Sequence, residues 1–356
     1  MKLLSIIVPA YNMEAYLAQC VESILRTPSL ARIEIVVVHD GSKDRTLRIA
    51  KQYADRYADT VRVIDKPNGN YGSTINEALK VVRGEYVKIL DADDCFDGSR
   101  VAEFLAFLQK MQGVDMVVTP FVEVRGKREN RVGYNIYSRK VYEYGKAYDA
   151  EQIFRDGAIR FFMMHGVCYR TELLRQMRYR QSEGISYTDQ EWVFYPLFRV
   201  KSIAFADIPL YRYNLSREGQ TMDIKVQMRN LSHLEAVTTA MAQYFILNVK
   251  RVSSSVRASF LRNIVADRVR IIFRKYLLVM DDNAFAKSDF ELVYVRLMRL
   301  VGQCKITKFS VPVNNLLKVD LLHLWQLQSK RYTPLFRRFL QFADGAMTAI
   351  HSLLFR

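Results

Sequence analysis

The chain has 356 residues, of which 50% are hydrophobic and 25% charged, and its formal net charge is +16. This composition excludes a largely disordered protein, and the length allows a large core and more than one domain. The four cysteines are scattered without a CxxC pair, which argues against a zinc-thiolate site or a disulfide framework and indicates a reducing cytosol.

Apolar runs of strand length alternate with amphipathic stretches over the first hundred residues. The predicted strands are residues 3–8, 33–38, 61–64 and 85–90, and the predicted helices are residues 13–25, residues 42–57 and a third that starts at residue 73. Asn12, Ser42 and Ser73 are the predicted N-caps. Strands without polar alternation, separated by helices, indicate an α/β fold with a mostly parallel sheet covered on both faces. Ligands of such sheets bind beyond the carboxyl ends of the strands.

The middle of the chain is less regular. It contains predicted strands at residues 114–119, 203–205 and 210–213, a Tyr-, Arg- and Lys-rich hairpin or surface excursion at 123–148, and predicted helices at 171–177 and 188–200, the latter interrupted by Pro196. From about residue 225 the pattern predicts long helices with almost no glycine. We therefore expect a catalytic or binding domain at residues 1–222 and a mainly helical region at residues 223–356.

Positive charge is concentrated in the last third of the chain. Residues 1–100 hold 14 Lys and Arg and 14 Asp and Glu, whereas residues 221–356 hold 21 and nine, a net charge of +12. Such a basic region favours an anionic partner, either phospholipid headgroups or nucleic acid. Residues 334–356 carry a wide apolar stripe flanked by arginines, typical of a helix in a membrane interface or of one packed on the first domain or on a second subunit.

The sequence YVKILDADDCFD at residues 86–97 places Asp91, Asp93 and Asp94 directly after a predicted buried strand. Carboxylates this close repel one another, and removing them from water is costly unless a positive charge compensates. Carboxylate oxygens suit Mg²⁺ or Mn²⁺, which in turn bridge the oxygens of a diphosphate. The segment therefore predicts a divalent-cation site, and the alternative is a solvated acidic turn.

Asp40 follows another predicted strand and precedes Gly41-Ser42. Its carboxylate could accept a hydrogen bond from a nucleobase, but an Asp-Gly-Ser sequence is also a good turn. Taken alone, Tyr11 and Asn12 likewise either contact a nucleotide or only form part of a turn.

Three blocks together carry a family resemblance: SIIVPAYNMEAYL at 5–17, EIVVVHDGSKDRT at 34–46 and YVKILDADD at 86–94. Over roughly residues 3–220 the chain resembles the inverting family 2 glycosyltransferases of the GT-A fold. The resemblance implies a sheet of that fold, a nucleotide-diphospho-sugar donor and a metal ion. It assigns the donor to Pro9, Tyr11, Asn12, Glu14, Asp40, Asn70, Asp91 and Ala92, with Asn76 or Ser73 as further candidates, and the metal ion to Asp93.

The same resemblance implies a catalytic base in an acidic motif that opens a helix, and TDQEW at 188–192 fits. Relatives commonly show Glu-Asp where this chain has Thr188-Asp189. Asp189 is the predicted base that takes the proton of an acceptor hydroxyl, and Glu191 is the second candidate. Either carboxylate could instead only stabilise the first turn of the helix. Trp192 is either a core residue or a platform for the acceptor.

LSREGQTM at 215–222 resembles the loop that folds over the diphosphate in this family. Arg217 is predicted to pair with phosphate oxygens, for which its planar fork is suited, and Gln220 is a weaker candidate. The alternative is a solvated loop. His165, in an apolar stretch, either helps to hold metal or acceptor or is a core residue.

The leading hypothesis is therefore a metal-dependent inverting glycosyltransferase that moves a sugar from a nucleotide-diphospho-sugar, expected to be a UDP-sugar, to a glycan or lipid-linked glycan in exopolysaccharide, capsule or cell-wall synthesis. The N-terminus is a poor signal peptide and no apolar window predicts a transmembrane helix, so we expect a cytoplasmic protein, peripheral on the inner face of the membrane, with self-association left open. A dehydrogenase is disfavoured because the GxGxxG turn is missing after the first strand. A nucleic-acid- or membrane-binding protein without transferase activity, including a scaffold that has lost catalysis, is the alternative.

Overall fold

The computed structural model describes residues 2–134, 141–217, 223–312, 320–328, 338, 340–342 and 344. Two compact units emerge: residues 1–223 with 252–260, and residues 224–251 with 261–356. Each is described by itself.

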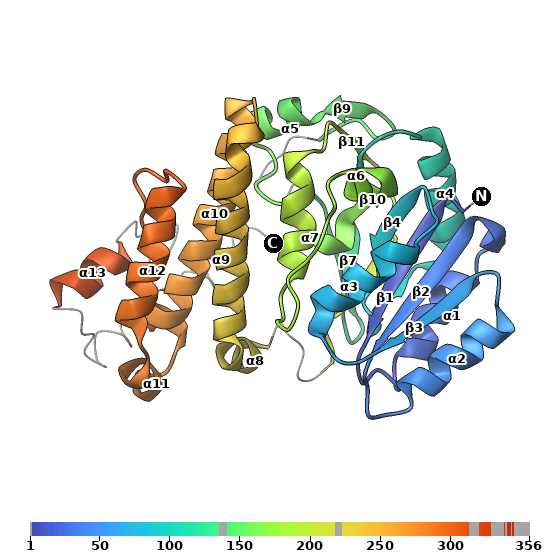
Figure 1. Ribbon diagram of the computed structural model, residues 1–356, viewed down its shortest axis with the longest axis horizontal. Coiled ribbons are helices and arrows are strands. Elements are labelled where there is room, and N and C mark those ends of the chain that lie inside the picture. Colours follow the sequence, from blue (N-terminus) through green and yellow to red (C-terminus); the bar gives the residue numbers. More distant parts are fainter. Residues whose placement is uncertain are drawn as a thin grey trace. The chain divides into compact units, whose positions relative to one another are not determined.

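An eight-stranded sheet forms the centre of the first unit (Figure 1). Its strands lie in the order β3 (Val61–Lys66), β2 (Ile33–Asp40), β1 (Leu4–Ala10), β4 (Tyr86–Ile89), β10 (Val167–Arg170), β6 (Met116–Val118), β11 (Ser202–Phe205) and β9 (Ala147–Asp149). The first four are parallel, as predicted. β10, which the sequence analysis missed, is antiparallel to both β4 and β6, so the second half of the sheet is mixed.

Helices cover both faces of this sheet, whose inner strands are largely apolar and buried. The helices of the unit are α1 (Leu17–Leu25), α2 (Thr46–Arg56), α3 (Asn70–Val81), α4 (Val101–Lys110), α5 (Ala150–Asp156), α6 (Thr171–Gln176) and α7 (Asp189–Phe194). Leu4, Ile6 and Val8 point to the face that packs against α1 and α4, and the alternate positions, such as Ile7, face the side of α3.

A second sheet has the order β5 (Cys95–Phe96), β12 (Tyr211–Asn214), β7 (Phe121–Arg125) and β8 (Arg128–Val132). β7 and β8 form the hairpin predicted within residues 123–148. β12 is parallel to β7 and antiparallel to β5, which follows the acidic segment directly. This sheet therefore ties the acidic segment to a part of the chain more than a hundred residues away.

All three predicted N-caps are wrong: Asn12 and Ser42 have partners in each other's loops, and Ser73 lies inside a helix that has already begun. α1 begins at Leu17, α2 at Thr46 and α3 at Asn70. The Asn12 amide oxygen accepts instead from the backbone N–H of Lys43 at 3.0 Å. The Ser73 hydroxyl lies inside α3 and donates to the Asn70 carbonyl at 2.7 Å. The helix predicted from residue 188 is confirmed as α7, followed by a 3₁₀ turn at Tyr195–Phe198 that contains Pro196.

The second unit is helical, as its sequence predicts. Its helices are α8 (Ile224–Arg229), α9 (Leu231–Asn248), α10 (Ser255–Arg274, of which residues 255–260 belong to the first unit), α11 (Asp282–Lys287), α12 (Phe290–Gln303) and α13 (Leu321–Leu327). Buried Glu235 on α9 accepts from Tyr276 at 2.6 Å and pairs with Arg296 of α12. No helix in the described part of the chain combines the length and the hydropathy needed to cross a bilayer. The predicted helix at 334–356 lies largely outside the described residues.

Candidate active site at the carboxyl edge of the sheet

Loops from β1, β2 and β4 meet at one edge because parallel strands present their carboxyl ends together. The loop after β1 is joined to the loop after β2 by several hydrogen bonds. The backbone N–H of Asn12 donates to Ser42 Oγ at 2.9 Å, and Arg45 donates its backbone N–H and Nε to Glu14 Oε2 at 2.9 and 3.1 Å. The Asn12 and Glu14 side chains thus hold the two loops together. The nucleotide contacts predicted for Asn12, Glu14, Pro9 and Tyr11 stay predictions. Tyr11 is 44% exposed, so its side chain is open to solvent at this edge.

Asp40 ends β2 and is 2% exposed, so its carboxylate needs local donors. Its Oδ1 accepts from Lys66 Nζ at 2.5 Å and from the backbone N–H of Gly69 at 2.9 Å, and its Oδ2 accepts from Asn68 Nδ2 at 3.1 Å. Lys66 ends β3, the neighbouring strand, and Asn68 follows it. The loop between β3 and α3 therefore fixes the carboxylate that the resemblance assigns to the nucleobase.

Within the acidic segment the three aspartates have different partners. Tyr71, on α3, donates its hydroxyl to Asp91 Oδ1 at 2.9 Å. Arg217 donates Nε to Asp93 Oδ2 at 2.7 Å, and Ala92 between the two aspartates is buried. Asp94 accepts from the Tyr211 hydroxyl at 2.5 Å and from the backbone N–H of Asn214 at 2.7 Å. Asp94 thus anchors the segment to β12, whereas Asp91 and Asp93 stand at the edge.

Negative charge at this edge is only partly compensated. Burial, followed by the nearby charge of Asp93, raises the pKa of Asp91 to about 7, and the charge of Asp189 adds to the rise. Burial also raises the pKa of Asp94 well above its ordinary value, again with the charges of Asp91 and Asp93 behind it. The Tyr71 hydroxyl and Arg217 act on Asp91 in the opposite direction without cancelling the effect. An added positive charge would therefore stabilise this edge.

Asp189 is the first residue of α7 and belongs to the same site. Its charge contributes to the raised pKa values of Asp91, Tyr71 and Tyr213, which places these four groups in one electrostatic neighbourhood. Glu191 has a different position. It is fully buried, and it accepts from the backbone N–H and hydroxyl of Ser182 at 2.6 and 2.7 Å and from Tyr195 at 2.9 Å. Glu191 thus holds the segment before α7 in place.

α3 packs very closely against that segment. A Cβ atom at Gly72 would lie 1.9 Å from the carbonyl oxygen of Ser182. Asn76 donates Nδ2 to the Gln181 carbonyl at 2.9 Å and to Glu183 Oε1 at 2.8 Å, and it accepts from the Gln181 N–H at 2.8 Å. The Asn76 amide is therefore engaged with this segment. Asn70, which begins α3, adopts a positive φ of 63°.

His165 lies in an aromatic cluster rather than at an open edge. Its ring stacks on Tyr213 at 4.2 Å and lies 4.9 Å from the rings of Phe121 and Tyr211. Burial, with a smaller effect of Lys88, lowers the pKa of His165 to about 3, so the ring is neutral. Trp192 is fully buried against Tyr169 and Tyr179, which makes it a core residue and not a platform for an acceptor. Gln220 lies outside the described residues.

Sequence reasoning missed the residues that hold the aspartates in place: Tyr71, Lys66, Asn68, Tyr211 and Asn214. Lys66 and Asn68 had a usable signal, because they border the Pro67-Asn68-Gly69 turn after a strand whose carboxyl end faces the site. Tyr71, Tyr211 and Asn214 had none, since their contacts depend on how distant elements pair.

A metal ion at this edge would have few protein ligands. Among the described residues, no group of three or more His, Cys, Asp or Glu side chains is arranged to hold one. Mg²⁺ is nevertheless often held by one or two carboxylates together with substrate phosphates and water. Asp93, beside Asp91, whose pKa is raised by burial and then by the charge of Asp93 itself, fits that mode of binding.

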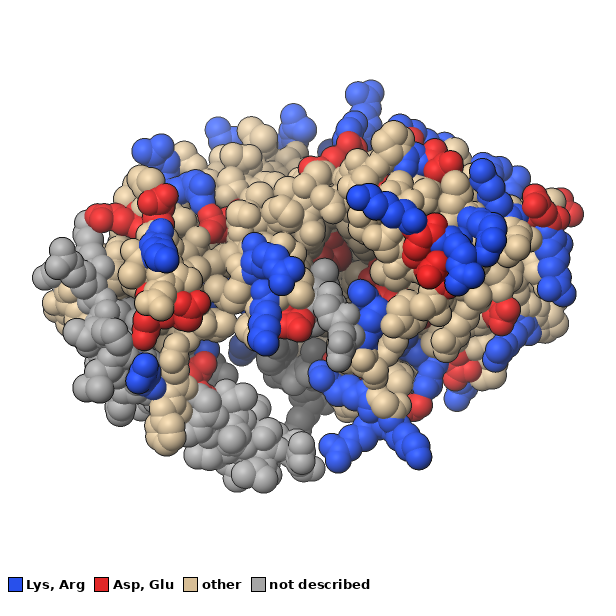
Figure 2. All heavy atoms as spheres, turned by 90° about the horizontal axis from the view of Figure 1, so that it is seen from below, with Lys and Arg blue, Asp and Glu red and all other residues tan. Residues whose placement is uncertain are grey.

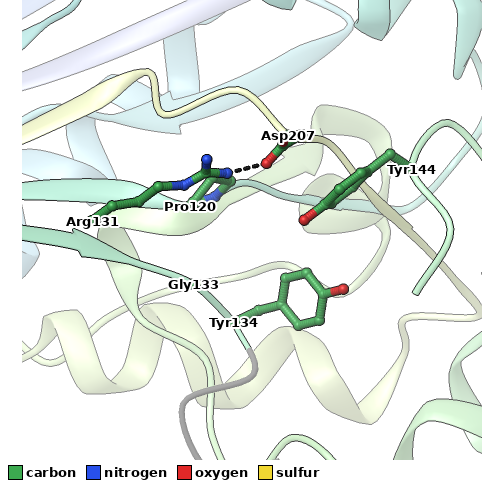
Figure 3. Close-up of a pocket in the computed structure, with 6 residues that line it drawn as sticks. All are labelled: Pro120, Arg131, Gly133, Tyr134, Tyr144 and Asp207. Atoms are coloured by element: carbon green, nitrogen blue, oxygen red, sulfur yellow. Dashed lines mark hydrogen bonds and ion pairs between the residues drawn. The ribbon is translucent and has the colours of Figure 1, made fainter. Parts of the chain in front are cut away.

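A separate hollow of about 330 Å³ is lined by none of the predicted site residues. Figure 3 shows its lining: Pro120, Arg131, Gly133, Tyr134, Tyr144 and Asp207. Arg131 and Asp207 form an ion pair, so the charged groups of the hollow satisfy each other. The hollow thus offers no charge to a donor.

Comparisons with known proteins agree with this geometry. Residues 5–178 match the family described as Glycosyl transferase family 2. The chain is 32% identical over 213 residues to EpsJ of Bacillus subtilis, an uncharacterised glycosyltransferase, and the match covers 59% of this chain and 60% of EpsJ. It is 33% identical over 125 residues to GgaB of the same organism, a minor teichoic acid biosynthesis protein, covering 35% of this chain and 14% of GgaB. The matches thus span less than two thirds of these relatives.

Among solved structures, residues 1–349 of TarS from S. aureus, in complex with UDP-GlcNAc, superpose with a TM-score of 0.62 at 21% identity. The superposition covers 85% of this chain and 82% of the other. The two proteins therefore share the GT-A-like fold, an α/β sheet flanked by helices and followed by a helical region.

Proposed function

We propose that the chain, whose residues 5–178 match glycosyl transferase family 2, transfers a sugar from a nucleotide-diphospho-sugar to a hydroxyl of a glycan or lipid-linked glycan acceptor, with inversion at the anomeric carbon. Residues 1–222 are the proposed catalytic domain, and residues 223–356 the basic helical region proposed to contact a membrane or a second subunit. The observation that carries the proposal is the meeting of Asp91, Asp93 and Asp189 at the carboxyl edge, with a raised pKa at Asp91.

The donor is proposed to lie across this edge. The nucleobase is placed near Tyr11 and Asp40, since the loops that carry these residues are fixed to each other and to the turn after β3. Asp91 is placed at the ribose. A UDP-sugar is the first donor to test, because TarS, which shares the fold, was solved with UDP-GlcNAc.

The chain's own charges have defined parts in this proposal. Asp93 would hold Mg²⁺ or Mn²⁺, and such an ion would supply positive charge against the negative charge that grows on the leaving diphosphate. Arg217, which pairs with Asp93, is a second cation at the same place and suits phosphate oxygens. Asp189 takes the proton of the acceptor hydroxyl as its oxygen attacks the anomeric carbon and the bond to the diphosphate breaks.

The acceptor class follows from the relatives and is part of the proposal. EpsJ is a glycosyltransferase, and GgaB is named for teichoic acid biosynthesis, so exopolysaccharide or cell-wall glycan synthesis at the inner membrane face is the proposed setting. A membrane- or nucleic-acid-binding protein without transferase activity is the competing candidate. The net charge of +16 and the apolar stripe flanked by arginines at residues 334–356 favour it.

A panel of nucleotide-sugars in a thermal-shift assay, with and without Mn²⁺, tests the proposal. We expect one donor to raise the Tm only when Mn²⁺ is present. Asp93→Ala should remove the dependence on Mn²⁺ and weaken donor binding about tenfold or more, because its carboxylate is the proposed ligand of the ion.

Asp97→Ala is the matched control, since Asp97 follows β5, close in sequence to the acidic segment, and among the described residues its carboxylate accepts from Ser99 alone. It should leave donor binding within about twofold of the wild type. If no nucleotide-sugar changes the Tm under any condition, the proposed function is wrong.

A further inference from the structure

Asp93, the proposed ligand of the metal ion, is already paired with a cation of the chain. Arg217 donates Nε to Asp93 Oδ2 at 2.7 Å. The side chains of Arg217 and Asp93 are only 26% and 14% exposed, so solvent screens this pair less than it screens a pair on the open surface. A divalent ion that binds Asp93 would therefore meet a guanidinium on the same carboxylate.

Two cations on one carboxylate weaken each other's binding, because like charges close together repel. A metal ion at this edge has few other protein ligands. Asp94 accepts from the Tyr211 hydroxyl and from the backbone N–H of Asn214. In the part of the chain that the structure describes, no group of three or more His, Cys, Asp or Glu side chains is arranged to hold an ion. The affinity for an ion therefore depends strongly on whether Arg217 is bonded to Asp93.

The chain is fixed up to the residue before Arg217. The backbone N–H of Asn214 donates to Asp94 Oδ1 at 2.7 Å. Ser216 Oγ accepts from the backbone N–H of Gly126 at 2.8 Å. Arg217 thus starts from a fixed point beside the acidic segment, and rotation of its own side-chain bonds is enough to reach either that segment or an anion bound next to it.

A diphosphate suits Arg217 better than Asp93 does. The contact with Asp93 uses Nε, whereas a phosphate group can accept two parallel hydrogen bonds from the planar guanidinium. If Arg217 moved to a phosphate, the Asp93 carboxylate would be left to a metal ion, which phosphate oxygens also ligate. Binding of a diphosphate and binding of an ion would thus favour each other.

We propose that Arg217 is an internal counter-cation of Asp93 and that a diphosphate draws it away, so that Mg²⁺ or Mn²⁺ binds tightly only when a diphosphate is bound as well. The metal-binding role of Asp93 and the diphosphate both come from the proposed function, on which the inference rests. The new element is that the affinity for the ion depends on the donor. By linkage, the ion must raise the affinity for the diphosphate by the same factor.

Binding of Mn²⁺ to the full chain without nucleotide tests whether Arg217 competes with the ion. Arg217→Gln should bind Mn²⁺ about tenfold more tightly than the wild type, since removing a neighbouring charge from a partly buried site changes binding by about this factor or more. Electron paramagnetic resonance of the unbound ion, at fixed ionic strength, measures the affinity. Arg217→Lys keeps the charge and should bind nearly as the wild type does. Equal or weaker binding in Arg217→Gln overturns the inference.

The effect of Arg217 has to be separated from that of net charge, because Lys and Arg side chains are widespread on the face shown in Figure 2. Arg212→Gln is the matched control. The Arg212 side chain is 26% exposed, as that of Arg217 is, but it pairs with Glu129 and not with the acidic segment. The control variant removes the same charge and should change the Mn²⁺ affinity by less than about twofold. An equal gain in both variants would assign the effect to net charge and overturn the inference.

Repeating the titration in the presence of UDP tests the exchange itself. UDP should tighten Mn²⁺ binding in the wild type by a factor about tenfold larger than in Arg217→Gln, because only the wild type has a guanidinium to transfer from the carboxylate to a phosphate. An equal tightening in both proteins overturns the exchange. If UDP tightens Mn²⁺ binding in neither, the uridine donor of the proposed function is wrong, and the titration without nucleotide alone decides whether Arg217 competes with the ion.

Discussion

Glu34, near the amino end of β2, and Asp91, beyond the carboxyl end of β4, are carboxylates at opposite ends of one sheet. Glu34 is 1% exposed and fully partnered: Ser5 donates to it at 2.5 Å, Arg83 Nε at 2.9 Å, and the backbone N–H groups of Arg83 and Gly84 also donate. Burial by itself would raise the pKa of Glu34, but these hydrogen bonds outweigh it and the pKa is lowered.

Asp91 shows the reverse, a pKa raised to about 7 by burial and by Asp93. One end of the sheet therefore uses a carboxylate to hold strands together. At the other end, the described partners of Asp91 and Asp93 offset the burial and mutual repulsion of these carboxylates only in part. Unbalanced charge of this kind is typical of functional sites. Three predictions test how far this contrast holds.

The largest effect is expected from Asp189→Asn at the charged end. Transfer should fall about a thousandfold in kcat with donor affinity and Tm nearly unchanged, because the amide cannot take the acceptor proton. The measurement is sugar transfer with the donor identified by thermal shift. Glu172→Gln, a first-turn carboxylate on α6, is the control and should transfer normally. A normal rate in Asp189→Asn would leave Asp189 with only a helix-stabilising role.

At the amino end of the strands, where Glu34 is paired, Glu34→Gln should lower the stability of the fold instead of the rate of transfer. Removing the negative charge to which Arg83 and Ser5 donate should lower the free energy of unfolding by about 2 kcal/mol, as for hydrogen bonds to a charged group, because Glu34 is buried while Arg83 is half-exposed. Urea unfolding measures this. Glu77→Gln, which breaks only an exposed pair with Lys80, should change it by less than about 0.5 kcal/mol. If Glu34→Gln lowered the free energy of unfolding no more than Glu77→Gln does, the contrast between Glu34 at one end of the sheet and Asp91 at the other would disappear.

The smallest effect is expected from Asp91→Asn, and its sign depends on pH. The folded pKa of Asp91 is above the unfolded value of about 4, so the folded state binds the proton more tightly and stability falls as pH rises from about 4 to 7. The Asn variant has no such loss. It should match the wild type below pH 4 and be more stable at pH 8. Thermal or urea unfolding at both pH values decides. A gain of equal size at both would show that charge is not the cause.

Local sequence patterns predict some parts of the molecule, and contacts between distant residues limit the prediction of the rest. The first four strands and their helices follow from apolar runs and 3.6-residue periodicity, and Asp91 and Asp93 are found because they follow a strand directly. The partners of these aspartates cannot be found in this way. Arg217 is 124 residues from Asp93, and Tyr211 reaches Asp94 only because β12 pairs with β5.

The helix caps fail for a related reason. Local propensity favours Asn12, Ser42 and Ser73 as caps, but each finds a partner in another loop or within a helix already begun. At the carboxyl edge, tertiary hydrogen bonds thus decide over local preference, and that edge is where function is proposed. Glu191 is a further case in which tertiary hydrogen bonds decide. The sequence motif makes it a second candidate base beside Asp189, but in the structure its carboxylate accepts two hydrogen bonds from Ser182.

Gly72 affects the distance between the residues proposed to bind the donor and the residue proposed to take the acceptor's proton. It has no side chain where α3 passes the Ser182 carbonyl, and an added methyl group would collide there. On one side of this contact, Tyr71 of α3 donates a hydrogen bond to Asp91. On the other side, Ser182 is hydrogen-bonded to Glu191, which lies on α7 together with Asp189. The absence of a side chain at Gly72 therefore permits the close approach that sets the distance between Asp91, the residue proposed to hold the donor, and Asp189, the proposed proton acceptor.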